Sequence, residues 1–307
     1  MVQKIILGDC INELKTFEKE SIDLVIADPP YWKVVGEKWD YEWRTEEDYV
    51  KWSLKWISEV SEVLRKGGTF YLFGYFRTLA LLVPYLEQFG LELRQQILID
   101  KGMRSVSGRA TKNYKIFPNT TESALFIIKD SKPFIKKFLK ERQKIMKFTS
   151  KDMNEKMGLS TIGGGMWSIY TGENICEQVP TEELWNKLKE ILQFDYDYNK
   201  LSQTFNPQMG LTDVWRDIDF YNETRYHPTQ KPIKLIQRLI NASSNKNDLV
   251  LDPFGGSGST ALACLMSERQ FITIEKDEEY YKTIKQRVSI FLNPLHNFTP
   301  VSVYTEI

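Results

Sequence analysis

The stretch from residue 247 to residue 288, NDLVLDPFGGSGSTALACLMSERQFITIEKDEEYYKTIKQRV, constrains the fold most. Its pattern predicts a short apolar strand, a glycine-rich turn, a helix, a second strand that ends in an acid, and another helix. Two strands joined by a helix pair in parallel, because the helix carries the chain back across one face of the sheet. This stretch therefore predicts a parallel sheet with helices packed against it.

The same alternation of strands and helices occurs in the first 130 residues. Strand patterns are found in KIILGDC, IDLVIAD, TFYLFGY, ELRQQILID and ESALFIIK, and helix patterns in INELKTFEKE, EEDYVKWSLKWISEVSEVLRKGG and TLALLVPYLEQFG. We expect the second helix to end at Gly67 and Gly68, and Pro84 to open or bend the third. The predicted fold class is α/β, with a doubly wound, mostly parallel, Rossmann-like sheet.

The middle of the chain differs in character from both flanks. Residues 134–205 are rich in lysine at first and then show short helical stretches, with no strand pattern. We expect a smaller helical insert here. The chain then divides into residues 1–133, the insert at 134–205, and residues 206–307.

Composition excludes several classes of protein. Hydrophobic residues make up 42% and charged residues 27% of the chain, and no apolar run reaches the length of a membrane span. The N-terminus becomes polar too early for a signal peptide, so we predict a cytoplasmic protein with no membrane partner. Three scattered cysteines and two histidines form no metal-binding pattern, and we expect neither a disulfide framework nor a metal site.

Charge is unevenly distributed, although the formal net charge is zero. Residues 94–115 contain six basic residues and one acid, and residues 129–151 contain nine basic residues and two acids, for local net charges of +5 and +7. Such runs favour a polyanionic partner, but they are as often the solvated face of a helix. Charge alone leaves both interpretations open.

The sequence VIADPPYW, at residues 25–32, ends a predicted buried strand with two prolines and two aromatic rings. Prolines stop strand pairing and stiffen the turn, so the carbonyls of Asp28 and Pro29 are left to accept hydrogen bonds. The Asp28 carboxylate is a further acceptor, and the Tyr31 ring offers a flat face. This combination suits a planar amine, although a lone pair of prolines more often marks an ordinary turn.

The sequence DPFGGSGST, at residues 252–260, predicts a site for a nucleoside-containing cofactor. Its glycines follow a strand directly and let a ligand approach the backbone, and Glu275 ends the next strand, where it could accept both ribose hydroxyls. The GxGxxG spacing is absent, and Asp252 suits an ammonium group better than a pyrophosphate. S-adenosylmethionine fits this chemistry. Asp9 could contribute in the same way, or could simply cap the helix that follows it.

Taken together, ADPPYW, HPTQKP, and DPFGGSGST followed by FITIEKD resemble the amino-DNA methyltransferases, which methylate exocyclic amines. The order of these motifs, catalytic first and cofactor last, resembles the β class of that family, in which the methyltransferase sheet is circularly permuted. The resemblance covers about residues 4–134 and 224–288. The helical insert sits where such enzymes carry a target-recognition domain.

The resemblance implies methyl transfer from S-adenosylmethionine to adenine N6 in double-stranded DNA, with base flipping onto Tyr31. It assigns the catalytic turn to Asp28, Pro29, Pro30 and Tyr31. It assigns cofactor contacts to Asp9, Asp28, Lys231, Asp252, Phe254, Gly255, Ser257, Ser259 and Glu275. The basic loop and insert are expected to contact DNA through Arg104, Arg109, Lys112, Lys136, Lys137 and Lys140. A cognate restriction endonuclease and a second copy in a homodimer are compatible partners.

Four other functions differ in how well they fit the sequence. Methylation of cytosine C5 is excluded, since it needs a cysteine after a proline and no cysteine follows one. Transfer to cytosine N4 stays open, although enzymes of that type more often carry serine at the position of Asp28. A non-catalytic DNA-binding subunit and a dehydrogenase are further alternatives, disfavoured by the intact acceptors and by the glycine spacing.

Overall fold

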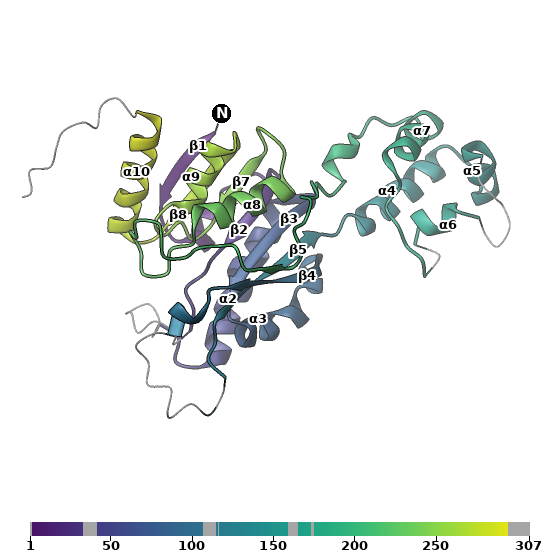
Figure 1. The fold of residues 1–307 in the computed structure, drawn as a ribbon. Coiled ribbons are helices and arrows are strands. Elements are labelled where there is room, and N and C mark those ends of the chain that lie inside the picture. Colours follow the sequence, from purple (N-terminus) through teal and green to yellow (C-terminus); the bar gives the residue numbers. More distant parts are fainter. Residues whose placement is uncertain are drawn as a thin grey trace, which may run out of the picture.

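The computed structural model describes residues 2–32, 42–106, 115, 117–158, 165–172 and 175–293. Within them, the centre is an eight-stranded sheet with the order β1-β8-β7-β2-β3-β5-β4-β6 (Figure 1). The strands are β1 (Gln3–Leu7), β2 (Ile22–Ala27), β3 (Leu64–Gly74), β4 (Leu91–Asp100), β5 (Thr121–Lys129), β6 (Val214–Trp215), β7 (Leu249–Asp252) and β8 (Gln270–Glu275).

Strand direction confirms the mostly parallel sheet. β5 runs antiparallel to both of its neighbours, β3 and β4, and every other neighbouring pair is parallel. All strands except β5 therefore end at the same edge of the sheet. β5 begins at that edge and ends at the opposite one.

Helices cover both faces of the sheet, which confirms the doubly wound α/β class. In β2, Leu24 and Ile26 face one hydrophobic core and Val25 and Ala27 the other, as the period of two in a strand requires. The first core is closed by α8 (Ile233–Ser243), α9 (Ser259–Met266) and α10 (Glu278–Leu292). The second is closed by α1 (Cys10–Leu14), α2 (Glu46–Val63) and α3 (Phe76–Leu82).

Three helices are shorter than the sequence predicts. α2 ends at Val63, and β3 begins at the next residue rather than after Gly68, because Leu64 already pairs with β2. α3 ends at Leu82 and gives way to a 3₁₀ turn around Pro84, which has no N–H to continue the helix. The helix predicted over residues 11–20 is confined to α1.

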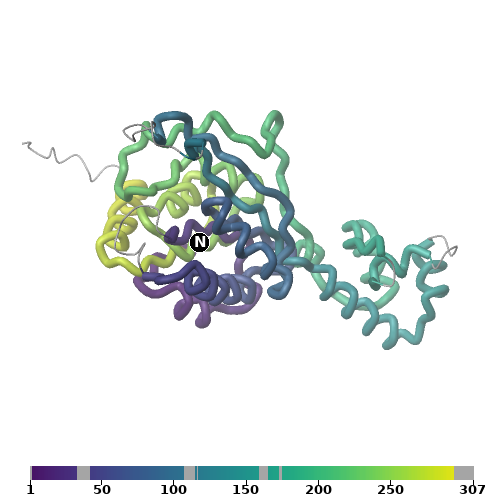
Figure 2. Tube along the Cα trace, turned by 90° about the horizontal axis from the view of Figure 1, so that it is seen from below, coloured from purple at the N-terminus to yellow at the C-terminus, as the bar shows by residue number. Residues whose placement is uncertain are grey.

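Four helices form a separate unit that projects beyond one end of the sheet (Figures 1 and 2). They are α4 (Lys132–Ile145), α5 (Ser150–Met157), α6 (Trp167–Tyr170) and α7 (Glu182–Leu192). Their apolar side chains, with Trp167 and Trp185 fully buried, form a third hydrophobic core of their own. The first turn of α4 contains the predicted boundary between residues 133 and 134.

The direction of β5 decides where this helical unit lies. α4 follows the end of β5, so the unit sits at the edge opposite the carboxyl ends of the parallel strands. Its return segment packs at the start of β3, where a Cβ on Gly67 would lie 2.4 Å from the carbonyl oxygen of Leu201. In the described part of the chain, no helix is long and apolar enough to cross a membrane.

Candidate active site

A cavity of about 480 Å³ opens at the carboxyl ends of β1, β2, β7 and β8. The segments that follow these neighbouring strands meet there because parallel strands end at one edge. Every residue predicted for the catalytic turn and the cofactor lies in its wall: Asp9, Asp28, Pro29, Pro30, Tyr31, Lys231, Asp252, Phe254, Gly255, Ser257, Ser259 and Glu275. The structure thus brings together residues more than 200 positions apart, whose individual roles stay predictions.

A residue of α2 supports the turn after β2. The hydroxyl of Tyr49 donates a hydrogen bond to the Pro30 carbonyl at 3.0 Å. Among the described residues, no donor reaches the Pro29 carbonyl, so this oxygen is available to a ligand in the cavity. The rigid turn therefore presents one backbone acceptor next to the Asp28 carboxylate.

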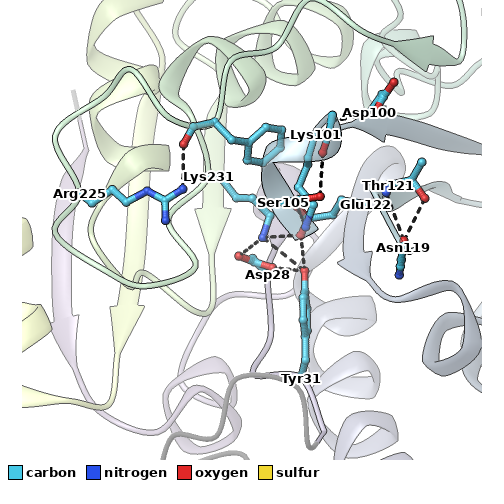
Figure 3. A network of polar contacts seen from close by, with 12 residues as sticks. Asp28, Tyr31, Asp100, Lys101, Ser105, Asn119, Thr121, Glu122, Arg225 and Lys231 are labelled. Atoms are coloured by element: carbon cyan, nitrogen blue, oxygen red, sulfur yellow. Dashed lines mark hydrogen bonds and ion pairs between the residues drawn. The ribbon is translucent and has the colours of Figure 1, made fainter. Parts of the chain in front are cut away.

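The Asp28 carboxylate takes part in a compact polar network (Figure 3). The Lys231 ammonium donates to its Oδ2 at 2.6 Å, and the Tyr31 hydroxyl lies 2.7 Å from its Oδ1. Lys231 comes from the segment before α8, and its side chain is buried. Burial alone would lower the pKa of this ammonium, but Asp28 and Glu122 outweigh burial and raise it.

Glu122, at the start of β5, is the member of this network that the sequence analysis did not identify. It is 7% exposed, its Oε1 lies 2.8 Å from both the Lys231 ammonium and the Tyr31 hydroxyl, and its Oε2 is 3.8 Å from the Lys101 ammonium. Burial would raise the pKa of this carboxyl, but the two lysines outweigh it and hold the pKa below its usual value. The signal in the sequence was an acid near the start of a strand whose centre, ALFII, is apolar.

Tyr31 is less accessible than a stacking platform requires. The residue is 8% exposed, and its ring meets Tyr75 edge to face, with 5.3 Å between the ring centroids. Burial, followed by the negative charges of Asp28 and Glu122, raises the pKa of its hydroxyl well above the usual value. The hydroxyl therefore stays protonated and acts as a hydrogen-bond donor within the network.

The glycine turn after β7 forms a cradle for a ligand. A Cβ on Gly255 would lie 2.5 Å from Oγ1 of Thr273, and Gly256 has a φ of +52°. The Gly256 N–H donates to Oε2 of Glu275 at 2.6 Å, which places this carboxylate beside the turn. Burial raises the pKa of the Glu275 carboxyl. This arrangement has the acceptors that ribose hydroxyls need and the open backbone that a cofactor needs.

Asp252 is a buried carboxyl in the cavity wall. Its Oδ1 accepts from the Phe254 N–H at 2.9 Å, and no basic side chain within the described ranges forms an ion pair with it. Burial raises its pKa to about 7. An unpaired buried carboxylate is costly unless a cation reaches it, so the site fits the ammonium group of S-adenosylmethionine.

The remaining predicted cofactor residues also have roles within the fold. The Asp9 carboxylate accepts from the Ile11 N–H at 3.0 Å and caps α1, as the alternative interpretation expects. The Ser259 hydroxyl donates to the Lys231 carbonyl at 2.7 Å and so helps position the lysine. Phe254 packs against Trp56, with 5.0 Å between the ring centroids. The cavity wall also contains three aromatic residues that were not predicted from the sequence, namely Trp52, His227 and Tyr280.

The predicted DNA-binding residues fall at two opposite ends of the sheet. Arg104 follows β4 and lies at the cavity end, whereas Arg109 and Lys112 lie outside the described residues. Lys136, Lys137 and Lys140 lie on α4 in the helical unit. Within that run, Lys136 pairs with Glu177 at 3.6 Å and Arg142 donates to the Leu192 carbonyl at 2.7 Å, so part of its charge serves the fold.

Comparison with known proteins gives the same family as the motifs. A family model described as DNA methylase, of the N6 and N4 type, matches residues 22–286. The DNA adenine methyltransferase YhdJ of Escherichia coli is 29% identical, over 93% of this chain and 82% of its own length. The type II methyltransferase M.HpaI of Haemophilus parainfluenzae is 27% identical, over 95% of this chain and 76% of its own.

Solved structures share the fold. A complex of M1.HpyAVI with SAM superposes with a TM-score of 0.57 at 23% identity, covering 94% of this chain and 99% of that one. The PvuII DNA methyltransferase, described as cytosine-N4-specific, gives a TM-score of 0.58 at 17% identity, covering 94% of this chain and 86% of that one. These likenesses agree with the sheet predicted from the sequence.

Proposed function

Because the chain belongs to the family of N6 and N4 DNA methylases, we propose that it transfers a methyl group from S-adenosylmethionine to the N6 amine of adenine in double-stranded DNA. One observation carries the proposal. The acceptors of Asp28 and Pro29 open into the same cavity as the glycine turn, Asp252 and Glu275. A site for an amine and a site for an adenosine cofactor therefore lie side by side.

The cofactor half of the cavity binds by charge and by backbone access. Asp252 would hold the ammonium of S-adenosylmethionine, and Glu275 would accept hydrogen bonds from its ribose hydroxyls. When bound there, S-adenosylmethionine supplies the electrophilic methyl group of the reaction. The chain's contribution is to orient the cofactor and to keep water away from it.

The catalytic turn makes the target amine a better nucleophile. The lone pair of an exocyclic amine is delocalised into its ring, which makes the nitrogen unreactive. Hydrogen bonds from its two protons to the Asp28 carboxylate and the Pro29 carbonyl favour a pyramidal nitrogen with a free lone pair. Pro29 and Pro30 hold the two acceptors at fixed positions, so little reorganisation is needed as the reaction proceeds.

Access to the amine requires a flipped nucleotide, because the atom is hidden within a duplex. Tyr31 is the proposed stacking partner, and its covered ring implies that base entry rearranges it. Arg104 lies at the cavity end of the sheet, and with the rest of the basic loop it is the proposed phosphate-binding element next to the flipped base. Lysines of the helical unit, at the other end of the sheet, would contact duplex further away or DNA held by a second copy.

Cytosine N4 is the second candidate acceptor, because cytosine presents the same amine beside a ring nitrogen. The aspartate at position 28 and the named adenine specificity of one relative favour adenine. Transfer of tritiated methyl groups to amplified DNA, which carries no methylation, tests the proposal. N6-methyladenine after digestion to nucleosides supports it, N4-methylcytosine redirects it, and no transfer refutes it in favour of a non-catalytic DNA-binding subunit.

Two partners remain predictions from the resemblance. A cognate restriction endonuclease would be blocked by the same modification, so methylated DNA would resist it. A homodimer would give twice the mass of the chain in sedimentation.

A further inference from the structure

A buried acid lies behind the cavity and touches two of the residues in its wall. Glu122 does not line the cavity, yet its Oε1 is 2.8 Å from the Lys231 ammonium and 2.8 Å from the Tyr31 hydroxyl. These are the same two donors that reach Asp28. Glu122 and Asp28 therefore share one ammonium and one hydroxyl between them (Figure 3).

This sharing bears on the strength of Asp28 as an acceptor. Both of its oxygens already hold a donor, and an ammonium that binds a carboxylate withdraws part of its negative charge from other donors. If Asp28 were the single anionic partner of Lys231, the ammonium would attract Asp28 alone and would weaken it most as an acceptor. Glu122 draws the ammonium and the hydroxyl towards itself. Asp28 then keeps more of its charge for an incoming amine.

The lysine is equally necessary for the two acids. Their carboxylates both contact the Tyr31 hydroxyl, at 2.7 and 2.8 Å, so they are close neighbours of like charge. Without a cation between them, two such groups share a proton, and one carboxyl titrates at higher pH. Lys231 lies between the two acids, 2.6 Å from Asp28 and 2.8 Å from Glu122, and offsets the repulsion between their charges.

We propose that Glu122 is a positioning residue for methyl transfer, which draws Lys231 and Tyr31 partly away from Asp28 and so leaves the Asp28 carboxylate free to accept the target amine. This inference rests on the proposed function, since it assumes that Asp28 binds an amine. It makes the pair of Glu122 and Lys231 part of the catalytic machinery, although Glu122 touches no substrate. A purely structural pair would affect stability and leave the rate and its pH profile unchanged.

The central experiment compares Glu122→Gln with the wild-type chain in single turnover, with tritiated S-adenosylmethionine and amplified DNA. The variant should transfer methyl groups about tenfold more slowly, which is the effect expected for one hydrogen bond to a charged group. Cofactor affinity should change less than twofold, because Glu122 lies outside the cavity. A rate within twofold of the wild type between pH 6 and 9 would overturn the inference.

A double-mutant cycle gives a readout that loss of stability cannot imitate. In Lys231→Met, Asp28 loses its cation and Glu122 keeps Lys101 at 3.8 Å, so the repulsion between the two acids should make the rate low at pH 7 and let it rise with pH. The other charged or titratable groups facing this cluster are Lys101 beside Glu122, Asp252 across the cavity and Tyr49 below the turn. Adding Glu122→Gln removes the repulsion and should raise the rate at pH 7 above that of Lys231→Met. A double variant slower than Lys231→Met would contradict the inference.

Asp23→Asn is the matched control. It also removes a carboxylate paired with a largely buried cation, Arg65 at 2.8 Å, but at the start of β2, away from the cavity. Its rate per folded molecule should equal that of the wild type, with folding checked by thermal unfolding. The rate of the wild type distinguishes failure of the proposed function from failure of this inference. If the wild type transfers no methyl group, the proposed function fails, whereas transfer by the wild type with an unaffected Glu122→Gln refutes this inference alone.

Discussion

The two ends of the sheet carry charge in different ways. At the cavity end, Asp28 and Lys231 lie in the cavity wall with Glu122 behind them, and Lys231 pairs with both acids. In the helical unit at the other end, the lysines lie on the surface of α4, over a separate apolar core. A cluster of opposite charges buried beside a cavity points to chemistry. A run of one sign on a helix points to solvation or to a diffuse contact with a polyanion.

The two ends of the sheet are also far apart. β5 connects the two ends, from Thr121 near the cavity to Lys129 at the helical unit, and spans roughly 27 Å at a rise of about 3.4 Å per residue. A base in the cavity is therefore beyond the reach of the α4 lysines of the same chain. The catalytic end should therefore dominate chemistry and cofactor binding.

The largest effect is expected from Asp28→Ala. The variant loses the side-chain acceptor and keeps the Pro29 carbonyl, so the amine retains one of its two hydrogen bonds. The rate of methyl transfer in single turnover should fall on the order of a hundredfold to a thousandfold. Cofactor and DNA affinity, measured separately, should fall much less, since the contact strengthens mainly in the transition state. Asp28→Asn keeps an acceptor oxygen and should transfer methyl groups faster than the alanine variant. A wild-type rate in Asp28→Ala would show that the Asp28 carboxylate does not activate the amine.

Glu275→Ala should come next and should act on binding. Loss of a charge-assisted acceptor for the ribose hydroxyls should cost about 1.5–3 kcal/mol of S-adenosylmethionine affinity, measured by calorimetry. Because the Gly256 N–H also loses its partner, thermal unfolding without cofactor should be recorded alongside. Unchanged affinity would remove Glu275 from the cofactor site.

A pH-dependent effect is expected from Asp252, whose pKa burial raises to about 7. Below that pH the carboxyl is mostly protonated and must lose its proton to pair with the cofactor's ammonium. Affinity should therefore rise with pH up to about 7, approaching tenfold per unit on the acidic side, and then level off. Asp252→Asn should bind weakly without this pH dependence.

The raised pKa of Asp252 also predicts how the stability of the cofactor-free protein depends on pH. The folded pKa of this carboxyl is raised above the unfolded value, so the folded state favours the neutral form and loses stability as pH rises from about 4 to 7. Asp252→Asn should therefore unfold at a higher temperature than the wild type at pH 8, and at a similar one at pH 4. Equal unfolding temperatures at both pH values would show that Asp252 is not buried as a costly charge.

The sequence predicted the cavity better than the network behind it, for a physical reason. Asp28, Asp252 and Glu275 each end or follow a strand, and parallel strands end at one edge, so a local pattern suffices to bring them together. Glu122 begins a strand. It reaches the same edge because β5 runs antiparallel between β3 and β4, and its partner Lys231 is more than 100 residues away. Strand direction depends on the packing of the whole sheet, which no local pattern reveals.

The position of the helical unit has the same cause. Its composition predicted a helical insert, and the apolar periodicity of α7 is visible in ELWNKLKEIL. Its placement at the edge away from the cavity follows from the direction of β5, on which the sequence analysis made no prediction. Likewise, the basic run at residues 129–151 gave no sign that Lys129 donates to the carbonyls of Ser61 and Phe89.

The smallest expected effect compares one basic residue from each end of the sheet. Arg104→Ala removes a cation after β4, at the cavity end of the sheet, and Lys137→Ala removes an exposed cation from α4. Each phosphate contact contributes about 0.9 to the slope of the logarithm of DNA affinity against the logarithm of salt concentration. Arg104→Ala should lower that slope by about 0.9 on a duplex of about 15 base pairs with the target adenine at its centre. Such a duplex reaches roughly 25 Å to either side, less than the length of β5, so Lys137→Ala should leave the slope unchanged. On a longer duplex the Lys137 variant should lose slope as well if the helical unit contacts DNA at a distance. A loss of slope for Lys137→Ala alone, on the short duplex, would reverse the comparison and place the recognition surface on the helices.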